Sequence, residues 1–410
     1  INGVDDANLS ALEGISNVKK LGVIGVAKAD LSTRIADPKV STIGVTALSK
    51  DDLLSSSNYY SDLQNVKVTS LGLEGVPSTS LSSVLSTPKL GVKVKSVEVT
   101  GVLAKDVNAV GSRAQVSKMT VNDTSANLAA NFNALLKQQN KIDTVTQSTK
   151  TDMSLTGSQF KGGTSLLAKF DSGDYTVNLK NVLAGDAGDL ASNSKVKDIQ
   201  VTDSGLNIGR NFDALSGSTI TKITQASLKD SISISADQYT SGTTTLAKMT
   251  AGSYALAITG YTYTTANDLT TLTSNAAIKT VSPVGLPIAD LTTVVANAKV
   301  SGVQISDTAT NVNTSLLTLK ANITKIAGIQ NSENPSGTRP NIVFTPATYS
   351  AALADKLSGF STVVDYDNNA HTNNSSLYSI TTDANGLRTI SRGGIKQTYS
   401  SNVNFFKFSD

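Results

Sequence analysis

Two stretches of this chain repeat each other, and this internal repeat constrains the fold more than any other feature. Residues 153–190 and 232–269 align at a constant offset of about 79 residues. The matching pairs include Gln159 with Gln238, Leu167 with Leu246, Tyr175 with Tyr254 and Asp189 with Asp268. Self-similarity at a fixed period predicts a repeat architecture, in which one structural unit is built several times and stacked on itself.

A second motif brackets the first one. It reads VNDTSANLAANFNALL at 121–136, VTDSGLNIGRNFDALS at 201–216 and ISDTATNVNTSLLTLK at 305–320. The first two copies each run on to a similar sequence, IDTVTQS and ITKITQAS. The super-repeat is therefore about 80 residues long and is clearest in residues 115–330.

A shorter rhythm lies inside the super-repeat. Apolar runs typical of strands recur at 21–26, 40–45, 66–73, 92–99, 116–121, 197–201, 254–258, 299–305 and 324–329. Segments with helical spacing lie between many of them, at 27–38, 78–88, 103–112, 266–275 and 288–298. The step of about 20–27 residues is typical of one turn of a leucine-rich-type solenoid.

This rhythm predicts a β-rich α/β fold, a right-handed β/α solenoid of short strands and short helices over residues 1–330. Alternating Val and Ile residues place one face of each strand inward, and each turn covers the next. The alternative is a string of small β-sandwich domains of about 80 residues. The helical spacing that recurs in successive turns favours the solenoid.

Ser, Thr and Asp precede the predicted helical segments, where such residues cap a helix. In DTSANLAANF, Asp123 or Thr124 can accept hydrogen bonds from backbone N–H groups. Leu128, Phe132 and Leu135 then form one apolar stripe. Asp123, Asp203 and Asp307 occupy equivalent repeat positions, and capping explains them without a metal, although a stacked row of aspartates could also bind calcium between turns.

The pattern changes after residue 330, so residues 331–410 form a separate C-terminal segment. The sequence NSENPSGTRPN, which ends at Asn341, predicts a linker or loop, and residues 347–359 predict one more helix. The rest of the tail alternates apolar and polar residues, with turn signals at 384–386 and 393–394. It predicts antiparallel β-hairpins that cap the stack or pair with the next subunit.

The composition argues against most enzyme classes. The chain contains no Cys, no Trp and one His, and its net charge is only +3. These numbers exclude a disulfide framework and disfavour metal chemistry, nucleophilic catalysis and nucleic-acid binding. No apolar run approaches the roughly 18 residues of a membrane span.

The unit VxDTxxNxxxNFxAL…ITQS…LAKF…GxYxV…DL resembles repeats of large proteobacterial extracellular proteins, which include haemolysin-type, adhesin-like and surface-layer proteins. The resemblance covers about half of the chain and rests on structural motifs alone. It implies type I secretion without a cleaved N-terminal signal and a scaffold role at the bacterial surface. The calcium-binding nonapeptide run of that class is missing, and the C-terminal VNFFKFSD loosely resembles its secretion signal.

Asp365, Asp367 and Asn369 have the spacing of the oxygen ligands that open an EF-type loop. The sixth position is Ala370 rather than Gly, and the twelfth is Ser376 rather than Glu. The segment is therefore a candidate for a calcium site of another kind, with a polar turn as the favoured alternative. Catalytic residues are not expected: a Ser-His-Asp triad would have to use His371, in a polar loop.

Aromatic residues gather at the end of the chain, at Tyr399, Phe405, Phe406 and Phe408. They predict either the core of a capping segment or a subunit interface, where aromatic residues are enriched. Taken together, the sequence predicts an extracellular structural protein whose partner is itself, in a surface layer or filament, with cell-surface polysaccharide as a further partner. An adhesin-type module that recognises a glycan or surface is the alternative, and neither nucleic-acid binding nor membrane insertion is expected.

Overall fold

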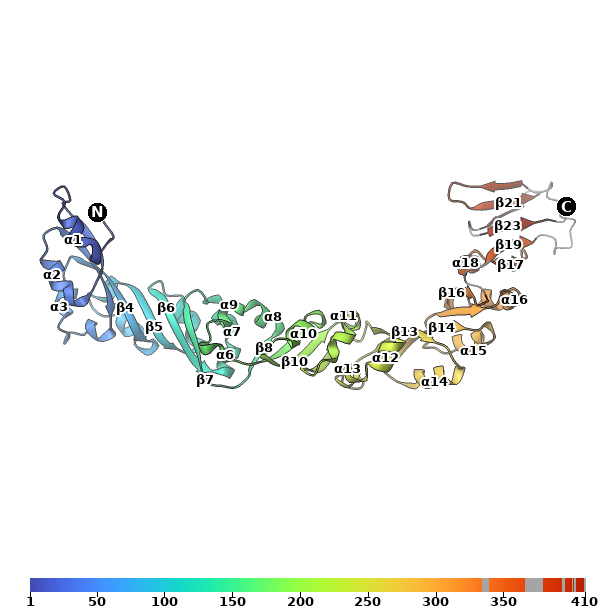
Figure 1. The fold of residues 1–410 in the computed structure, drawn as a ribbon, viewed down its shortest axis with the longest axis horizontal. Helices are drawn as coiled ribbons and strands as arrows, with labels where there is room; N and C mark the ends of the chain where they lie inside the picture. Colours follow the sequence, from blue (N-terminus) through green and yellow to red (C-terminus); the bar gives the residue numbers. More distant parts are fainter. Residues whose placement is uncertain (334–338, 366–378, 393–394, 400, 402, 409–410) are drawn as a thin grey trace. The chain divides into compact units, whose positions relative to one another are not determined.

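The computed structural model describes the chain except for residues 334–338, 366–378, 393–394, 400, 402 and 409–410 (Figure 1). It divides into two compact units. The first contains Ile1–Val182 and Asp189–Gln200, and the second contains Leu183–Gly188 and Val201–Asp410. Short parallel strands alternate with short helices in both, and a separate antiparallel sheet lies near the C-terminus of the chain. The fold is therefore mixed α/β.

The first unit is built on a seven-stranded sheet whose strands follow one another in sequence order (Figure 1). Every neighbouring pair is parallel. The strands are β1 (Val4–Asp5), β2 (Leu21–Val26), β3 (Val40–Leu48), β4 (Val68–Pro77), β5 (Val94–Val102), β6 (Val116–Thr124) and β7 (Ile142–Thr149). Two further strands, β8 (Met153–Thr156) and β9 (Val177–Val182), also pair in parallel.

Short helices connect these parallel strands, as a crossover between parallel neighbours requires. In the first unit they are α1 (Leu9–Glu13), α2 (Leu31–Ala36), α3 (Tyr60–Leu63), α4 (Leu81–Leu85), α5 (Val107–Gly111), α6 (Ser125–Ala130), α7 (Phe132–Lys137), α8 (Gly157–Gly162) and α9 (Thr164–Leu167). Two elements, α10 (Ala184–Ala191) and β10 (Val196–Asp203), include residues of both units.

The second unit contains a six-stranded parallel sheet, again almost in sequence order. Its strands are β12 (Ile232–Ser235), β13 (Leu256–Thr262), β14 (Ile278–Leu286), β15 (Val303–Asp307), β16 (Ile326–Asn331) and β18 (Leu357–Ser358), and β11 (Ile220–Gln225) precedes them. Its helices are α11 (Gly205–Arg210), α12 (Ala236–Ser241), α13 (Thr243–Ala247), α14 (Ala266–Ser274), α15 (Leu291–Val295), α16 (Ala309–Thr314), α17 (Leu316–Ala321) and α18 (Ala351–Ala354).

The C-terminal segment is only partly antiparallel. The strands β20 (Ser379–Thr382), β21 (Arg388–Arg392) and β22 (Ile395–Tyr399) form an antiparallel sheet, as predicted, with a turn at Ala384–Asn385. The last strand, β23 (Val403–Lys407), instead pairs in parallel with β19 (Ser361–Asp365), which pairs in parallel with β17 (Asn341–Phe344). The predicted Gly393-Gly394 turn lies outside the described residues.

Each inner strand buries one row of aliphatic side chains, and β5 shows why its sequence suits this position. Val94, Val97, Val99 and Val102 are at most 1 % exposed, while the residues between them face outward. Burying a valine stabilises the fold by about 1.5 kcal/mol or more. We call one strand with the connection that follows it a turn. Since the neighbouring strands of each parallel sheet repeat this row, the buried core continues along the sheet.

The last buried residue of many strands lies three positions after the previous one instead of two, because a β-bulge adds one residue between them. The register of β4 against β5 shifts between Leu73 and Val76, and that of β5 against β6 between Val99 and Val102. In β5 the extra residue is Gly101, whose φ of +65° is the left-handed conformation that favours glycine. Positive φ recurs at the equivalent positions Gly25, Ala47, Gly75, Asn181, Gly260 and Gly285.

Atomic detail supports the super-repeat. Thr156 and Gln159 form a capping box at α8, and Ser235 and Gln238 form the same box at α12. A Cβ added at Gly163 would lie 2.7 Å from the Phe132 ring, so only glycine leaves room for that aromatic side chain. The second copy repeats this packing with Gly242 and Phe212, where the distance would be 2.2 Å.

Most of the predicted strands and helices are present at the predicted positions, but their first and last residues differ from the predicted ones. Several predicted helical segments form as a 3₁₀ turn followed by a short α-helix; residues 78–88, for example, contain the 3₁₀ turn Ser78–Ser80 and then α4. The helix predicted at 347–359 is only the four residues of α18, because residues 357–358 pair as β18. The strands pair in parallel, whereas the strands of β-sandwich domains are antiparallel.

Candidate functional site

The repeated aspartates are the most regular polar feature of the structure. Asp123 is 7 % exposed and is the last residue but one of β6. Its Oδ2 accepts a hydrogen bond from the backbone N–H of Ala104 at 3.0 Å. Its Oδ1 accepts from the backbone N–H of Thr124 at 2.8 Å and from Asn127 Nδ2 at 2.7 Å. One carboxylate therefore fastens a turn to the residue that lies 19 positions earlier.

Asp203 and Asp307 make the same bonds in the second unit. Asp203 accepts from the backbone N–H of Ala184 at 3.0 Å, and Asp307 accepts from that of Ile288 at 2.8 Å. Each also accepts from its following backbone N–H and from the asparagine four residues later. We call Asp123, Asp203 and Asp307 the bracket aspartates. Their oxygens are occupied by N–H donors, which agrees with the capping role expected from the sequence.

Hydrogen bonds decide the charge state of the first bracket aspartate. Burial alone raises the pKa of the Asp123 carboxyl group, but the bonds from Asn127, Thr124 and Ala104 outweigh it. The pKa of Asp123 therefore lies below its ordinary value, and the group is ionised at neutral pH. Thr124 caps α6 separately, since its hydroxyl oxygen accepts from the backbone N–H of Asn127 at 3.2 Å.

Lysines form a second set of ties between turns. Lys67 stands directly before β4, and its Nζ donates to the backbone carbonyl oxygens of Ile35 at 2.7 Å and Asp37 at 2.8 Å. These carbonyls end the helix α2 of the preceding turn, where a cation also interacts favourably with the helix dipole. We call the lysines whose Nζ donates to a backbone carbonyl of the preceding turn the ladder lysines: Lys39, Lys67, Lys93, Lys141, Lys169, Lys195, Lys248, Lys299 and Lys325.

The ladder lysines reach carbonyls that lie 22 to 33 residues earlier, which is one turn of the repeat. Burial lowers the pKa of Lys93 and of Lys248, as expected for ammonium groups that sit between packed turns. Nine of the 35 Lys and Arg residues of the chain therefore donate to backbone carbonyls within the protein. This arrangement gives rigidity and leaves these cations little freedom to bind a ligand.

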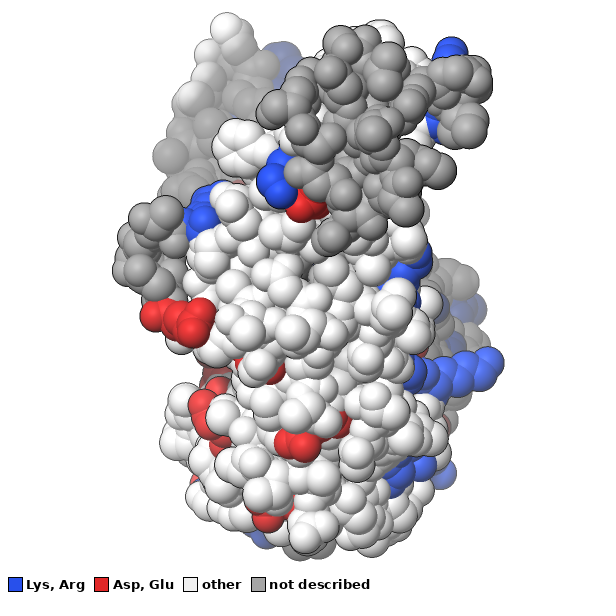
Figure 2. Space-filling view, turned by 90° about the vertical axis from the view of Figure 1, so that its right-hand side faces the viewer, with Lys and Arg blue, Asp and Glu red and all other residues white. Residues whose placement is uncertain are grey.

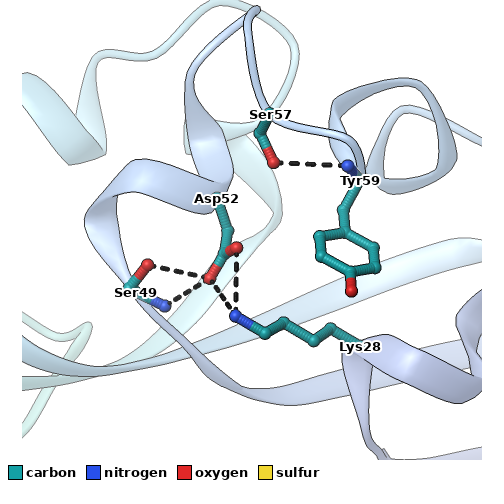
Figure 3. A network of polar contacts seen from close by, with 5 residues as sticks. All are labelled: Lys28, Ser49, Asp52, Ser57 and Tyr59. Carbon is teal, nitrogen blue, oxygen red and sulfur yellow. Dashed lines mark hydrogen bonds and ion pairs between the residues drawn. The ribbon is translucent and has the colours of Figure 1, made fainter.

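A different tie occurs in the second and third turns of the first unit (Figure 3). Asp52 Oδ2 accepts from the backbone N–H and the hydroxyl of Ser49, both at 2.8 Å, and Lys28 Nζ lies 3.2 Å from each carboxylate oxygen. Lys28 Nζ also lies 5.6 Å from the centroid of the Tyr59 ring. Burial raises the pKa of Asp52, but the bonds from Ser49 and Lys28 outweigh it, so the pKa is lowered. This ion pair joins these two turns through a side chain, whereas the bracket aspartates join turns through a backbone N–H group.

The candidate calcium residues are only partly described. Asp365 ends β19 and is 8 % exposed, and its Oδ2 lies 3.2 Å from Lys407 Nζ. Asp367, Asn369 and His371 lie outside the described residues. Within the part of the chain that the structure describes, no cluster of three or more His, Cys, Asp or Glu side chains could hold a metal ion. Calcium binding by this segment stays a prediction.

The terminal aromatic residues divide into buried and exposed ones. Tyr399 is fully buried and meets Tyr349 edge-to-face at 4.6 Å and Phe406 at 5.2 Å. Phe406 and Phe408 are half-buried, and Phe405 is 62 % exposed. The burial of Tyr399 fits the capping-core interpretation. The exposure of Phe405 leaves this one side chain available for an interface.

A shallow hollow lies in the second unit. It is lined by Leu183, Gly185, Asp186, Asp203, Asn207 and Asn211. The side chain of Asn211 donates to the backbone oxygen of Asn207, and Asn207 donates to Asp203. Asn131, Asn127 and Asp123 make the same bonds in the first unit. The polar lining therefore repeats a structural motif.

Neutral side chains dominate the face of the molecule drawn in Figure 2. Figure 2 shows a face that is mostly neutral, with scattered single Lys, Arg, Asp and Glu side chains and no broad patch of one charge among the residues drawn in colour. No helix within the described residues is long and apolar enough to cross a membrane. No family model matches the sequence, and searches of curated proteins and of solved structures gave no significant match.

Sequence reasoning found the bracket aspartates and missed the ladder lysines. The signal was present, because a Lys stands immediately before the first buried strand residue in turn after turn, as in Lys67-Val68, Lys93-Val94 and Lys141-Ile142. Lysines are usually treated as solvated surface charges. Their alignment with the strand rhythm was the feature that distinguished them.

Proposed function

We propose that this chain is an extracellular structural protein that self-assembles into a surface layer or filament on a bacterial cell. The observation that carries the proposal is the use of its polar groups. Bracket aspartates and ladder lysines fasten consecutive turns to each other in both units. A stack built this way suits a scaffold, since the bracket aspartates and ladder lysines bond to the backbone of neighbouring turns and not to a ligand.

The proposal includes a finer description of the architecture. Parallel strands in sequence order, with one helical connection per turn, support a right-handed β/α solenoid. Only 16 % of the residues are charged, and the face in Figure 2 is mostly neutral. This supports an extracellular location, because a surface with few charges changes little with the salt of the medium. Export by type I secretion and contact with cell-surface polysaccharide belong to the same proposal.

The alternative is an adhesin-type module that binds a glycan or another surface. The observation that favours it is the hollow beside Leu183 and Asp186, where amide and carboxylate groups lie next to an exposed apolar side chain. Sugar sites combine such groups, although they usually also contain aromatic residues. Enzymatic activity is the third and weakest candidate function.

Electron microscopy of the purified chain distinguishes these functions. The structural proposal predicts ordered sheets or fibres that form without any added ligand. If calcium plays no part in assembly, they form equally in calcium and in chelator. Fibres that dissolve in chelator would add calcium to the assembly mechanism. Monodisperse particles that bind a glycan array saturably would favour the adhesin, and monodisperse particles without such binding would contradict both.

A further inference from the structure

Sheet edges in the second unit differ in how they are protected. A free edge strand presents unpaired N–H and C=O groups to any strand of another chain, and proteins usually block it. The edge strand β17 is blocked by Asn313, whose Nδ2 donates to the backbone oxygen of Asn341 at 3.0 Å. Asn313 Oδ1 also accepts from the backbone N–H of Val343 at 2.7 Å. The asparagine side chain thus takes the place of a neighbouring strand.

Other edges are protected by different means. Arg388 Nη1 donates to the backbone oxygens of Val403 at 2.8 Å and Asn404 at 3.2 Å, so the first two carbonyls of the edge strand β23 are occupied. The edge strand β12 is covered by α11, which packs so closely that a Cβ at Gly209 would lie 2.5 Å from the Ser233 oxygen. The edge strand β18 is only two residues long, which also limits pairing.

Among the residues that the structure describes, nothing protects the edge strand β20 in any of these ways. All four of its residues, Ser379, Ile380, Thr381 and Thr382, are exposed. It contains no charged residue, no proline and no register shift against β21. Within the described residues, the hydrogen bonds of β20 lead to β21 alone. The opposite edge strand of the same sheet, β22, carries the exposed charged side chain of Lys396.

The hairpin geometry decides which groups of β20 face outward. The backbone N–H of Asp383 donates to the Leu387 oxygen at 3.0 Å, which makes Thr382 and Arg388 a non-hydrogen-bonded pair. Hydrogen-bonded and non-hydrogen-bonded pairs alternate along an antiparallel ladder. The N–H and C=O groups of Thr381 therefore point towards β21. Those of Ile380 and Thr382 point to the free edge.

We propose that β20 pairs antiparallel with β20 of a second copy of this chain, with Thr381 lying opposite Thr381 of the second copy. In this register Ile380 lies opposite Thr382 of the second copy, and each outward N–H finds a carbonyl of the other strand. Two outward residues spaced two apart are self-complementary about a twofold axis. This self-complementarity points to a second copy rather than to an unrelated strand.

The side chains agree with this register. Thr381, Thr389 and Thr398 form one row across the sheet, in which the hydroxyl oxygens of Thr389 and Thr398 lie 3.1 Å apart. The pairing continues this threonine row into the second copy, and cross-strand Thr pairs are favourable. On the other face it covers Ile380, which is 47 % exposed. No like charges within β20 face each other, because the strand has none.

This inference rests on the proposed function and names one contact of the assembly. A twofold contact closes on itself and yields a dimer, so an open array requires a second, different contact. We expect the β20 pairing to be weak alone, since it joins only short strands, and to act together with that second contact.

Single cysteines test the register directly, because the chain contains no cysteine of its own. Residues in a non-hydrogen-bonded antiparallel pair have Cα atoms about 4.5 Å apart, within the range that a disulfide spans. Thr381→Cys is expected to form a disulfide-linked dimer about tenfold faster under mild oxidation than the matched variant Thr398→Cys. Thr398 is also exposed and lies on the same face, at the far edge of the same sheet. Equal rates for both variants would overturn the proposal.

Charge exchange gives a second test that does not depend on oxidation. Thr381→Lys and Thr381→Asp each place two like charges at the twofold axis and are expected to weaken association about tenfold. An equimolar mixture of the two is expected to restore it, whereas Thr398→Lys leaves it unchanged. Sedimentation velocity measures all four samples. Association that is unaffected in both single variants, or a mixture that stays as weak as its components, would contradict the β20 pairing.

The outcomes separate this inference from the proposed function. If Thr381→Lys still forms sheets or fibres and Thr381→Cys does not cross-link, the β20 pairing is rejected. The proposed structural function then still stands. Thr381→Cys that cross-links as a dimer, together with a wild-type chain that never forms arrays, would keep the β20 edge and reject the array.

Discussion

The carboxylate of Asp123 accepts a hydrogen bond at 3.0 Å from the backbone N–H of Ala104, 19 residues earlier in the chain. This contact joins the end of β6 to the start of the 3₁₀ turn that follows β5. Asp203 and Asp307 repeat it with Ala184 and Ile288. The N–H groups that begin these connecting segments would otherwise be buried without a partner.

Replacing Asp123 by Asn tests the bracket contact. Asn keeps one acceptor oxygen but turns an amide N–H₂ towards a backbone donor, which leaves a buried N–H unsatisfied at a cost of about 1–3 kcal/mol. Chemical denaturation of Asp123→Asn is expected to show that loss. Asp143→Asn, an exposed change on the neighbouring strand β7, serves as control and is expected to stay within about 0.5 kcal/mol of wild type.

The bracket also predicts the acid sensitivity of the first unit. The pKa of Asp123 is lower in the folded protein than in an unfolded chain, where it is about 3.9. A depressed pKa contributes stability that is present above the unfolded value and lost as the pH falls through the folded value. Stability measured between pH 6 and pH 2 should therefore fall below about pH 4, and less steeply in Asp123→Asn. An identical acid profile in the variant would contradict a role for this carboxylate.

Lys67→Met removes the two ladder bonds while it keeps the apolar part of the side chain. The loss of charge-assisted bonds to Ile35 and Asp37 is expected to destabilise the first unit by about 1–2 kcal/mol. Because the acceptors are neutral carbonyls, wild-type stability should change little between low and moderate salt. Lys95→Met removes an exposed lysine bonded only to Val92, three residues before it, and should have little effect. An equal loss of stability in Lys67→Met and Lys95→Met would contradict a stabilising role that is specific to the ladder lysines.

Ala47 is a position where the natural residue is not the best one. Its φ of +54° places a Cβ in the left-handed region, which glycine adopts without strain. Ala47→Gly is therefore expected to leave stability unchanged or to raise it by up to about 1 kcal/mol, despite the greater freedom of the unfolded chain. Gly101→Ala should lower it by a similar amount. As a control, Ala109→Gly, in the middle of α5, should destabilise by about 1 kcal/mol. A clear loss of stability in Ala47→Gly would contradict the bulge geometry.

Much of the fold could be predicted because the strand signal is strong and repeated. Valine-rich runs such as LGVIGV become β2 over the predicted residues, and the equivalence of Asp123, Asp203 and Asp307 appears as identical hydrogen bonds. Because the same strand and helix pattern recurs in several copies, a chance match in one copy does not change the predicted fold. The C-terminal antiparallel sheet was predicted from alternation and turn residues in the same way.

Contacts between turns were harder to predict. The ladder lysines bond to carbonyls that lie 22 to 33 residues away, and no local pattern shows which carbonyl a flexible side chain will reach. The parallel position of β23 beside β19 joins residues about 40 apart, where alternation alone suggested another hairpin. Tyr399 was equally ambiguous, because a terminal aromatic residue suits a core and an interface alike.

Negative-stain electron microscopy of the purified wild-type chain, in calcium and in chelator, tests the central claim most directly. The account predicts ordered sheets or fibres that form from this chain alone, at protein concentrations where association is detected by sedimentation. Isolated particles in both conditions, at every concentration tried, would contradict self-assembly by this chain.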